Sequence, residues 1–101
     1  MNDILAFIEK AKKLHTVYEY LHGGCYAFAK ALSIRYDGII YVNRKEEHCV
    51  VKINNKFYDI TGERKINKDY HVFRTKEEKI IAKEYRLSDT NEVLIEKLMN
   101  I

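Results

Sequence analysis

The 101-residue chain contains no proline, four glycines, two cysteines and no long apolar run. No segment approaches the roughly 20 consecutive apolar residues that a membrane-spanning helix requires. A signal peptide is not expected either, because Asp3, Glu9 and several lysines occupy the region where its apolar core would lie. We therefore expect a cytoplasmic protein with no membrane partner, and we expect both cysteines to remain thiols.

The chain also lacks a large excess of one charge, because it contains 18 basic and 15 acidic residues and its net charge is only +3. A dedicated nucleic-acid binder needs a concentrated basic surface, so nucleic acid is not an expected partner. The missing proline and the many Ile, Lys, Asn and Tyr residues are typical of a low-GC coding source, such as a bacterium or phage. Since 47% of the residues are hydrophobic, one core and one domain over residues 1–101 are expected. The sequence carries no signal for the oligomeric state.

Two helices are predicted in the first third of the chain. Apolar residues recur at three- and four-residue steps over residues 3–20, which indicates an amphipathic helix. His22, Gly23 and Gly24 break this pattern. A second helix is predicted over residues 24–34, and it should be buried because almost its whole surface is apolar.

Short strands follow, which makes the predicted fold α+β, with the N-terminal helices packed on a small antiparallel sheet. The segments 39–42, 48–53 and 56–60 are rich in β-branched and aromatic residues, as strands are. Asn54-Asn55 predicts a tight two-residue turn between the last two, because asparagine tolerates positive φ.

The remainder of the chain is predicted as a polar loop over 64–69, a strand over 70–73, a helix over 76–84 and a closing helix. Asp89 or Thr90 can cap the closing helix. Its apolar face would consist of Val93, Leu94, Leu98 and Ile101. Lysines alternate with glutamates over 65–83, which favours a solvated helix surface over a nucleic-acid site.

Three residues form a candidate catalytic site: Cys25, His48 and Asp59. A cysteine attacks a carbonyl carbon only as its thiolate, which a helix N-terminus and a nearby imidazole both stabilise. Cys25 follows two glycines at the point where the buried helix begins, and His48 opens a strand. Asp59 closes the partner strand, so an aspartate is available to orient the imidazole.

The predicted hairpin register brings His48 and Asp59 together. With a two-residue turn at 54–55, Asp59 lies opposite Val50, and His48 lies opposite Thr61 or Gly62. Side chains two residues apart share one face of a strand. Asp59 should therefore lie diagonally across from His48 on the same face.

The segments 23–29, 48–53 and 56–62 resemble the papain-like cysteine enzyme superfamily, and most closely its transglutaminase-like branch and its small phage or bacterial peptidases. The resemblance implies a minimal papain-like core, no cofactor, and thioester chemistry on an amide bond of a protein or peptide substrate. Cys25 would be the nucleophile, His48 the general base and Asp59 the orienting acid. It leaves open whether the enzyme is a peptidase, a deamidase, a transglutaminase or an inactive relative.

The oxyanion donor departs from the pattern of papain-like proteases, which often place a glutamine six residues before the cysteine. Glu19 occupies that position here, and an ionised carboxylate would repel the oxyanion. Tyr18, Tyr20 and His22 are alternatives that the sequence does not separate. The backbone N–H of Cys25 is a further candidate.

Other interpretations of these residues remain. Strand alternation turns Cys49 away from the face of His48, so we interpret Cys49 as a core residue, and His15 and His71 as structural or surface residues. The set His22, Cys25, His48 and Cys49 lacks the paired spacing of zinc sites, so no metal is expected. The alternative function is a non-catalytic binding or inhibitor protein, because a domain this small leaves little room for a substrate cleft.

Overall fold

The computed structural model describes all residues except 1–2, 15, 22–24, 47 and 74–88. Its helices are α1 (Asp3–Leu14), α2 (Val17–Leu21), α3 (Cys25–Tyr36) and α5 (Asp89–Met99). Its strands are β1 (Ile39–Asn43), β2 (His48–Ile53), β3 (Lys56–Asp59), β4 (Gly62–Arg64) and β5 (His71–Val72). The strands form one antiparallel sheet in the order β4-β3-β2-β1-β5.

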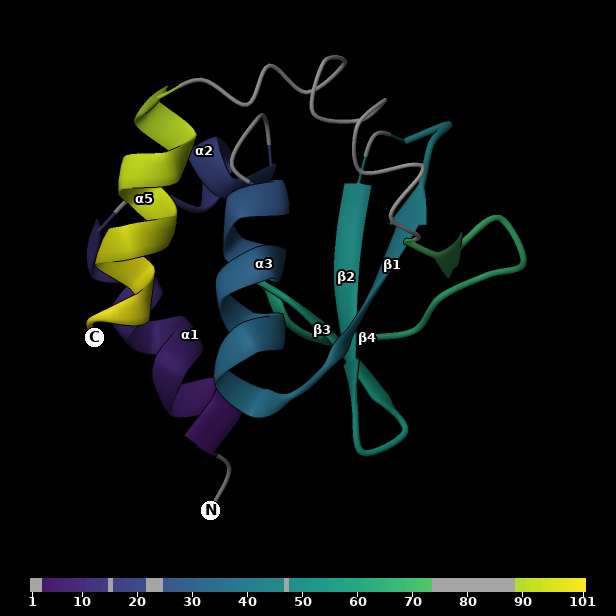
Figure 1. Cartoon of the computed structure of the whole chain (residues 1–101). Coiled ribbons are helices and arrows are strands. Elements are labelled where there is room, and N and C mark those ends of the chain that lie inside the picture. Colours follow the sequence, from purple (N-terminus) through teal and green to yellow (C-terminus); the bar gives the residue numbers. More distant parts are fainter. Residues whose placement is uncertain (1–2, 15, 22–24, 47, 74–88) are drawn as a thin grey trace.

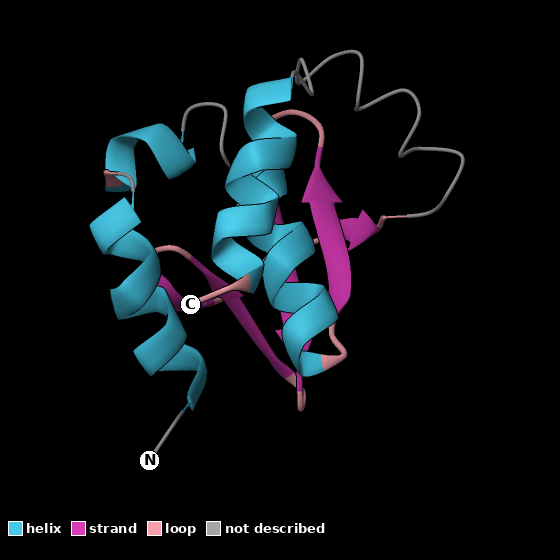
Figure 2. Ribbon diagram, turned by 60° about the vertical axis from the view of Figure 1, so that its left-hand side comes forward, coloured by secondary structure: helices cyan, strands magenta, loops and turns pink. Residues whose placement is uncertain are grey.

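The described helices gather on one side of this sheet (Figure 1, Figure 2). Helix α3 lies along the sheet and α5 packs against α3 (Figure 1). Helix α1 contacts α3 through the rings of Phe7 and Phe28. The prediction of an α+β fold with helices on an antiparallel sheet is confirmed. In the described part of the chain, no helix is both long enough and apolar enough to cross a membrane.

Helix α3 is the centre of the core, as its apolar sequence predicted. Seven of its residues are buried: Cys25, Tyr26, Ala27, Phe28, Ala29, Ala31 and Leu32. A helix that packs against a sheet on one side and against helices on the other needs apolar residues around most of its circumference. Cys25, the first residue of α3, is therefore positioned by a helix that packs against much of the core.

The β2–β3 hairpin agrees with the prediction. Asn54 and Asn55 both adopt positive φ, at 51° and 67°, and Ile53 pairs with Lys56 across them. Positive φ at both central residues is the geometry of a type I′ turn, which matches the twist of the flanking strands. The resulting register places Val51 opposite Tyr58.

The predicted loop is confirmed over residues 65–69, but β4 was missed, because the chain folds back at Ile60 and Thr61 and Arg64 belongs to the new strand. Gly62 pairs with Asp59 rather than lying opposite His48, whose partner is Asn43 in β1. The reversal depends on Gly62, whose φ of 111° is strained for any residue with a side chain. The short strand at 70–73 is confirmed as β5.

The single helix predicted over residues 3–20 is also wrong, since α1 ends at Leu14 and α2 begins at Val17. Thr16 and Glu19 have the sequence spacing of a capping box, which favours a new helix start at this point. The hydroxyl of Tyr20 donates to the carbonyl of Ala11 at 2.7 Å. This buried bond satisfies one of the carbonyls left unpaired at the end of α1.

The closing helix is present as α5, but its apolar face differs from the prediction. Leu94 and Leu98 are buried, whereas Val93 is 48% exposed and Ile95 packs against the core instead. The predicted turn at 22–24 and the predicted helix at 76–84 lie outside the described residues.

Candidate functional site

Cys25 is the first residue of α3 and is only 6% exposed. The N–H groups of the first helical turn have no partner within the helix, and the helix dipole is positive at this end. Both effects stabilise a thiolate. The sequence therefore placed Cys25 correctly at a helix start.

His48 and Asp59 meet on one face of the sheet, as the hairpin register predicted. His48 is the first residue of β2 and Asp59 the last residue of β3. The Nε2 atom of His48 lies 2.8 Å from Oδ2 of Asp59. Because Nε2 faces Asp59, the other ring nitrogen, Nδ1, is left for Cys25.

The Asp59 carboxylate is 2% exposed and accepts four hydrogen bonds. The backbone N–H and the hydroxyl of Thr61 donate to Oδ1 at 2.7 and 2.5 Å, and Arg64 donates to Oδ2 at 2.9 Å. Burial alone would raise the pKa of Asp59, but the bonds from His48 and Thr61 and the charge of Arg64 lower it below 3.8. Asp59 is therefore ionised at neutral pH.

Arg64 was not predicted as part of the site. Its guanidinium reaches Asp59 only because β4 returns alongside β3, and the sequence interpretation had ended the hairpin before Arg64. The signal was present in Asp59-Ile60-Thr61-Gly62, since an aspartate that bonds two residues ahead and a glycine that tolerates positive φ together favour a tight reversal.

Cys25 contacts both His48 and Cys49. The S–H group of Cys49 donates to the sulfur of Cys25 and is the largest influence on the pKa of Cys25. Burial opposes this influence, but the hydrogen bond and charge of His48 add to it, and the pKa falls from 9.0 to about 5. The same contact and its own burial raise the pKa of Cys49, so Cys49 stays protonated.

His48 is held in its charged form. Burial lowers the pKa of His48, but hydrogen bonds to Asp59 and Cys25 and their negative charges outweigh it and raise the pKa from 6.5 to about 9. Cys25 is thus a thiolate above about pH 5 and His48 an imidazolium below about pH 9. Between these values the two form an ion pair.

Cys49 is buried in the core, as predicted, but its contact with Cys25 was not foreseen. Strand alternation places His48 and Cys49 on opposite faces, and both nevertheless reach Cys25. Strand β2 pairs with β1 over His48–Lys52, whereas its pairing with β3 begins only at Val51. Helix α3, which begins at Cys25, packs directly on β2.

The structure leaves fewer of the predicted oxyanion donors available. Tyr20 lines the site, but its hydroxyl proton is committed to Ala11. Tyr18 is 69% exposed and does not line the site. The side chain of Glu19 and all of His22 lie outside the described residues. The backbone N–H of Cys25, in the first turn of α3, remains.

The hollow around these residues is closed. It is lined by Tyr20, Cys25, Phe28, His48, Cys49, Asp59 and Ile60, and the space between them is too small for a water molecule. In the described ranges, no three His, Cys, Asp or Glu side chains cluster in a way that could hold a metal ion. Any ligand of Cys25 therefore requires the hollow to open.

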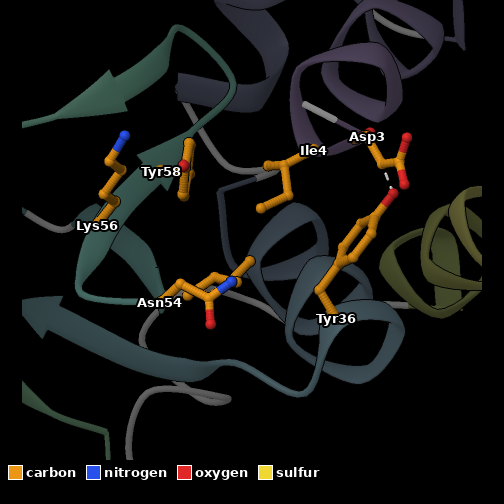
Figure 3. A pocket seen from close by; sticks show the side chains of 7 residues that line it. Asp3, Ile4, Tyr36, Asn54, Lys56 and Tyr58 are labelled. Carbon is orange, nitrogen blue, oxygen red and sulfur yellow. Dashed lines mark hydrogen bonds between the residues drawn. The ribbon is translucent and has the colours of Figure 1, made fainter. Parts of the chain in front are cut away.

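A larger cavity of about 690 Å³ lies at the opposite end of α3 (Figure 3). Asp3, Ile4 and Tyr36 line one side of it, and the β2–β3 hairpin lines the other (Figure 3). The 12 residues of α3 separate the two ends of the helix by about 17 Å at 1.5 Å per residue. This cavity cannot serve as a substrate cleft for Cys25.

The sequence matches the family model described as Phage YunG-like protein over residues 4–99. No curated protein and no solved structure matches the chain significantly.

The resemblance to the papain-like superfamily is therefore wrong. The family match spans nearly the whole chain, and nothing in the comparisons points to a papain-like or transglutaminase-like relationship. The misleading feature was the order of Cys25, His48 and Asp59 on short segments. Such constellations recur on unrelated folds because the chemistry requires them, so they do not establish ancestry.

Proposed function

We propose that this chain, which belongs to the Phage YunG-like protein family, is a cysteine-dependent hydrolase or acyltransferase that acts on an amide or peptide bond. One observation carries the proposal: Cys25, His48 and Asp59 form a continuous chain of hydrogen bonds. It links a helix start to the ends of two neighbouring strands. A nucleophile, a base and an orienting acid in that arrangement can perform acyl transfer.

In the first step, the thiolate of Cys25 attacks the carbonyl carbon of the substrate. The oxygen becomes negatively charged, and the N–H of Cys25 at the positive end of α3 is positioned to stabilise it. The imidazolium of His48 then donates its Nδ1 proton to the departing amine, which leaves a thioester on Cys25.

In the second step, neutral His48 takes a proton from water or from an acceptor amine, which attacks the thioester and releases Cys25. Asp59 keeps the imidazole oriented throughout, and Arg64 and Thr61 hold Asp59. No cofactor is required for either step.

Acylation by 4-nitrophenyl acetate tests this proposal without knowledge of the natural substrate. The folded chain should release a burst of about one 4-nitrophenolate per molecule, and mass spectrometry should place the acetyl group on Cys25. The Cys25→Ser variant should show no burst, and Cys49→Ser should retain it. If the acetyl group is absent from Cys25, or if the urea-unfolded chain is acetylated equally fast, the proposal is wrong.

The closed hollow favours a second candidate, a protein that acts by binding a partner and performs no chemistry. Cys25 is 6% exposed and the surrounding space excludes water. In that case Cys25→Ser should retain the full biological effect of the protein. Loss of the effect in Cys25→Ser, with the fold intact by circular dichroism, would favour the enzyme.

A further inference from the structure

Cys49 is a second thiol in contact with the nucleophile, and the proposed acyl transfer does not use it as a reactant. It is 2% exposed on β2, and it lines the same hollow as Cys25 and His48. Both cysteines are free thiols in this structure. Two adjacent sulfurs, one of them next to an imidazole, can perform oxidative chemistry as well as acyl transfer.

We propose that Cys25 and Cys49 form a reversible intramolecular disulfide when a hydroperoxide oxidises Cys25. The thiolate of Cys25 attacks the terminal peroxide oxygen, the O–O bond breaks, and the alcohol or water leaves with a proton from His48. Cys25 is then a sulfenic acid. The sulfur of Cys49 attacks the sulfur of Cys25, and the hydroxide that leaves takes up the Cys49 proton as water. Two electrons pass from the two thiols to the peroxide, and a small dithiol reverses the reaction.

The contact geometry favours the second step. Cys25 and Cys49 line the same hollow, which is too small for a water molecule, and the S–H group of Cys49 faces the sulfur of Cys25. The two atoms that must bond are therefore neighbours before oxidation. The chain that connects them runs through α3 and β1 into β2, and α3 packs directly on β2. The two elements that carry the sulfurs are therefore already in contact.

The loss of negative charge when Cys25 is oxidised also favours the attack by Cys49. In the reduced site, the hydrogen bond to Cys25, burial and the negative charge of Cys25 together raise the pKa of Cys49. A sulfenic acid is neutral, so conversion of Cys25 removes that negative charge. Cys49 then loses its proton more readily than before, at the stage when its thiolate is needed.

The disulfide would act as an off switch and as protection. It consumes the nucleophile, and it prevents further oxidation of Cys25 to the sulfinic acid, which small thiols do not reverse. The proposal needs a reactive Cys25 but does not need Cys25 to turn over an amide.

The test is stoichiometric hydrogen peroxide added to the reduced full chain at low protein concentration, followed by intact-mass measurement. The wild type should lose two hydrogen atoms in mass and lose both titratable thiols. Alkylation of Cys25 should disappear, and dithiothreitol should restore it fully. Peptide mapping should place the disulfide between Cys25 and Cys49.

The matched control is Cys49→Ser, which retains a small hydrogen-bond donor but cannot form the disulfide. One equivalent of peroxide should add one oxygen atom to this variant, and a second equivalent should add another. After the second addition, dithiothreitol should not restore its alkylation, whereas the wild type treated with the same two equivalents should still be restored. If the wild type gains oxygen like Cys49→Ser, or forms disulfides between molecules, the proposal is overturned.

The two proposals fail in different assays. A chain that is acetylated on Cys25 but forms no internal disulfide overturns the redox proposal alone. A chain that forms the disulfide but is never acetylated overturns the proposed acyl transfer alone.

Discussion

Alkylation of Cys25 by iodoacetamide should depend on pH in a way that an ordinary thiol does not. The reaction requires the thiolate, and the pKa of Cys25 is lowered to about 5. The rate should therefore rise with an inflection near pH 5 and then stay level. A second, smaller change should occur near pH 9, where His48 loses its proton.

The expected magnitude follows from two opposing effects. At pH 6, a thiol with a pKa of about 5 is about 90% ionised and one with a pKa of 9.0 about 0.1%, a gain of about 900-fold in thiolate. Nucleophilicity falls with basicity at a Brønsted coefficient of about 0.4–0.5, so a pKa lower by about four units costs about 40–100-fold. Ionisation and basicity alone would thus make a thiol of this pKa react about 10–20-fold faster than an ordinary thiol at pH 6, but about 40–100-fold slower at pH 10.

The assay is the rate of alkylation at Cys25 between pH 4 and 10, measured by peptide mass spectrometry on the native chain and on the urea-unfolded chain. Burial of Cys25 slows the native reaction at every pH, so the inflection carries the test and the absolute rate does not. His48→Ala should move the inflection to higher pH, because the thiolate loses its imidazolium partner. His71→Ala is the matched control, since His71 is an exposed histidine on β5. A native inflection near that of the unfolded chain, or one that His48→Ala leaves in place, would refute the ion pair.

Three further variants test the network behind Cys25 and the packing of α3. Asp59→Asn should lower the pKa of His48 below about 9, measured by NMR titration of its ring, and should cost about 1.5–3 kcal/mol for a lost charged hydrogen bond. The pKa of Asp59 in the folded protein lies below 3.8, so its ionised carboxylate stabilises the wild type above pH 3.8, and this stabilisation is lost as the pH falls further. The unfolding free energies of the wild type and of Asp59→Asn should therefore converge in acid. Arg64→Ala should move the pKa of His48 upward, because a positive charge next to Asp59 is removed and His48 is then the cation that remains beside this carboxylate. It should change the unfolding free energy by less than about 1 kcal/mol, since the Arg64 side chain is 43% exposed. Gly38→Ala should cost about 1–3 kcal/mol in urea denaturation, because the added Cβ would lie 2.5 Å from Cγ1 of Val51.

Each of these variants has an outcome that contradicts the reasoning. Equal pKa shifts of His48 in Asp59→Asn and Arg64→Ala would show that the shared carboxylate does not control the imidazole. An unfolding free energy of Gly38→Ala within experimental error of wild type would show that β2 yields freely at this contact.

The sequence predicted the site where local rules determine the geometry. Asn54-Asn55 sets the turn, the turn sets the register, and the register brings His48 and Asp59 to one face, so three steps of backbone geometry suffice. The position of Cys25 at a helix start followed from the glycines before it and the apolar segment after it. These residues needed no knowledge of distant parts of the chain.

Contacts that depend on packing between elements could not be obtained in this way. Arg64 reaches Asp59 only if the chain reverses at Ile60 and Thr61, and Cys49 reaches Cys25 only because α3 packs on β2. The break between α1 and α2 was missed because the apolar spacing continues through it. In each case the pattern of apolar residues in the sequence is compatible with more than one local structure, and contacts with distant parts of the chain determine which one forms.

The charge balance of the site explains how a small domain can bury an ion pair. Thiolate, imidazolium and carboxylate together carry a net charge of −1, and burying an unbalanced charge is costly. Arg64 adds the missing positive charge and stays 43% exposed, so one end of the network remains solvated. The four groups Cys25, His48, Asp59 and Arg64 then sum to zero between about pH 5 and pH 9. Arg64 therefore balances the buried charges of Cys25, His48 and Asp59 through its bond to the Asp59 carboxylate, while its own side chain stays partly solvated.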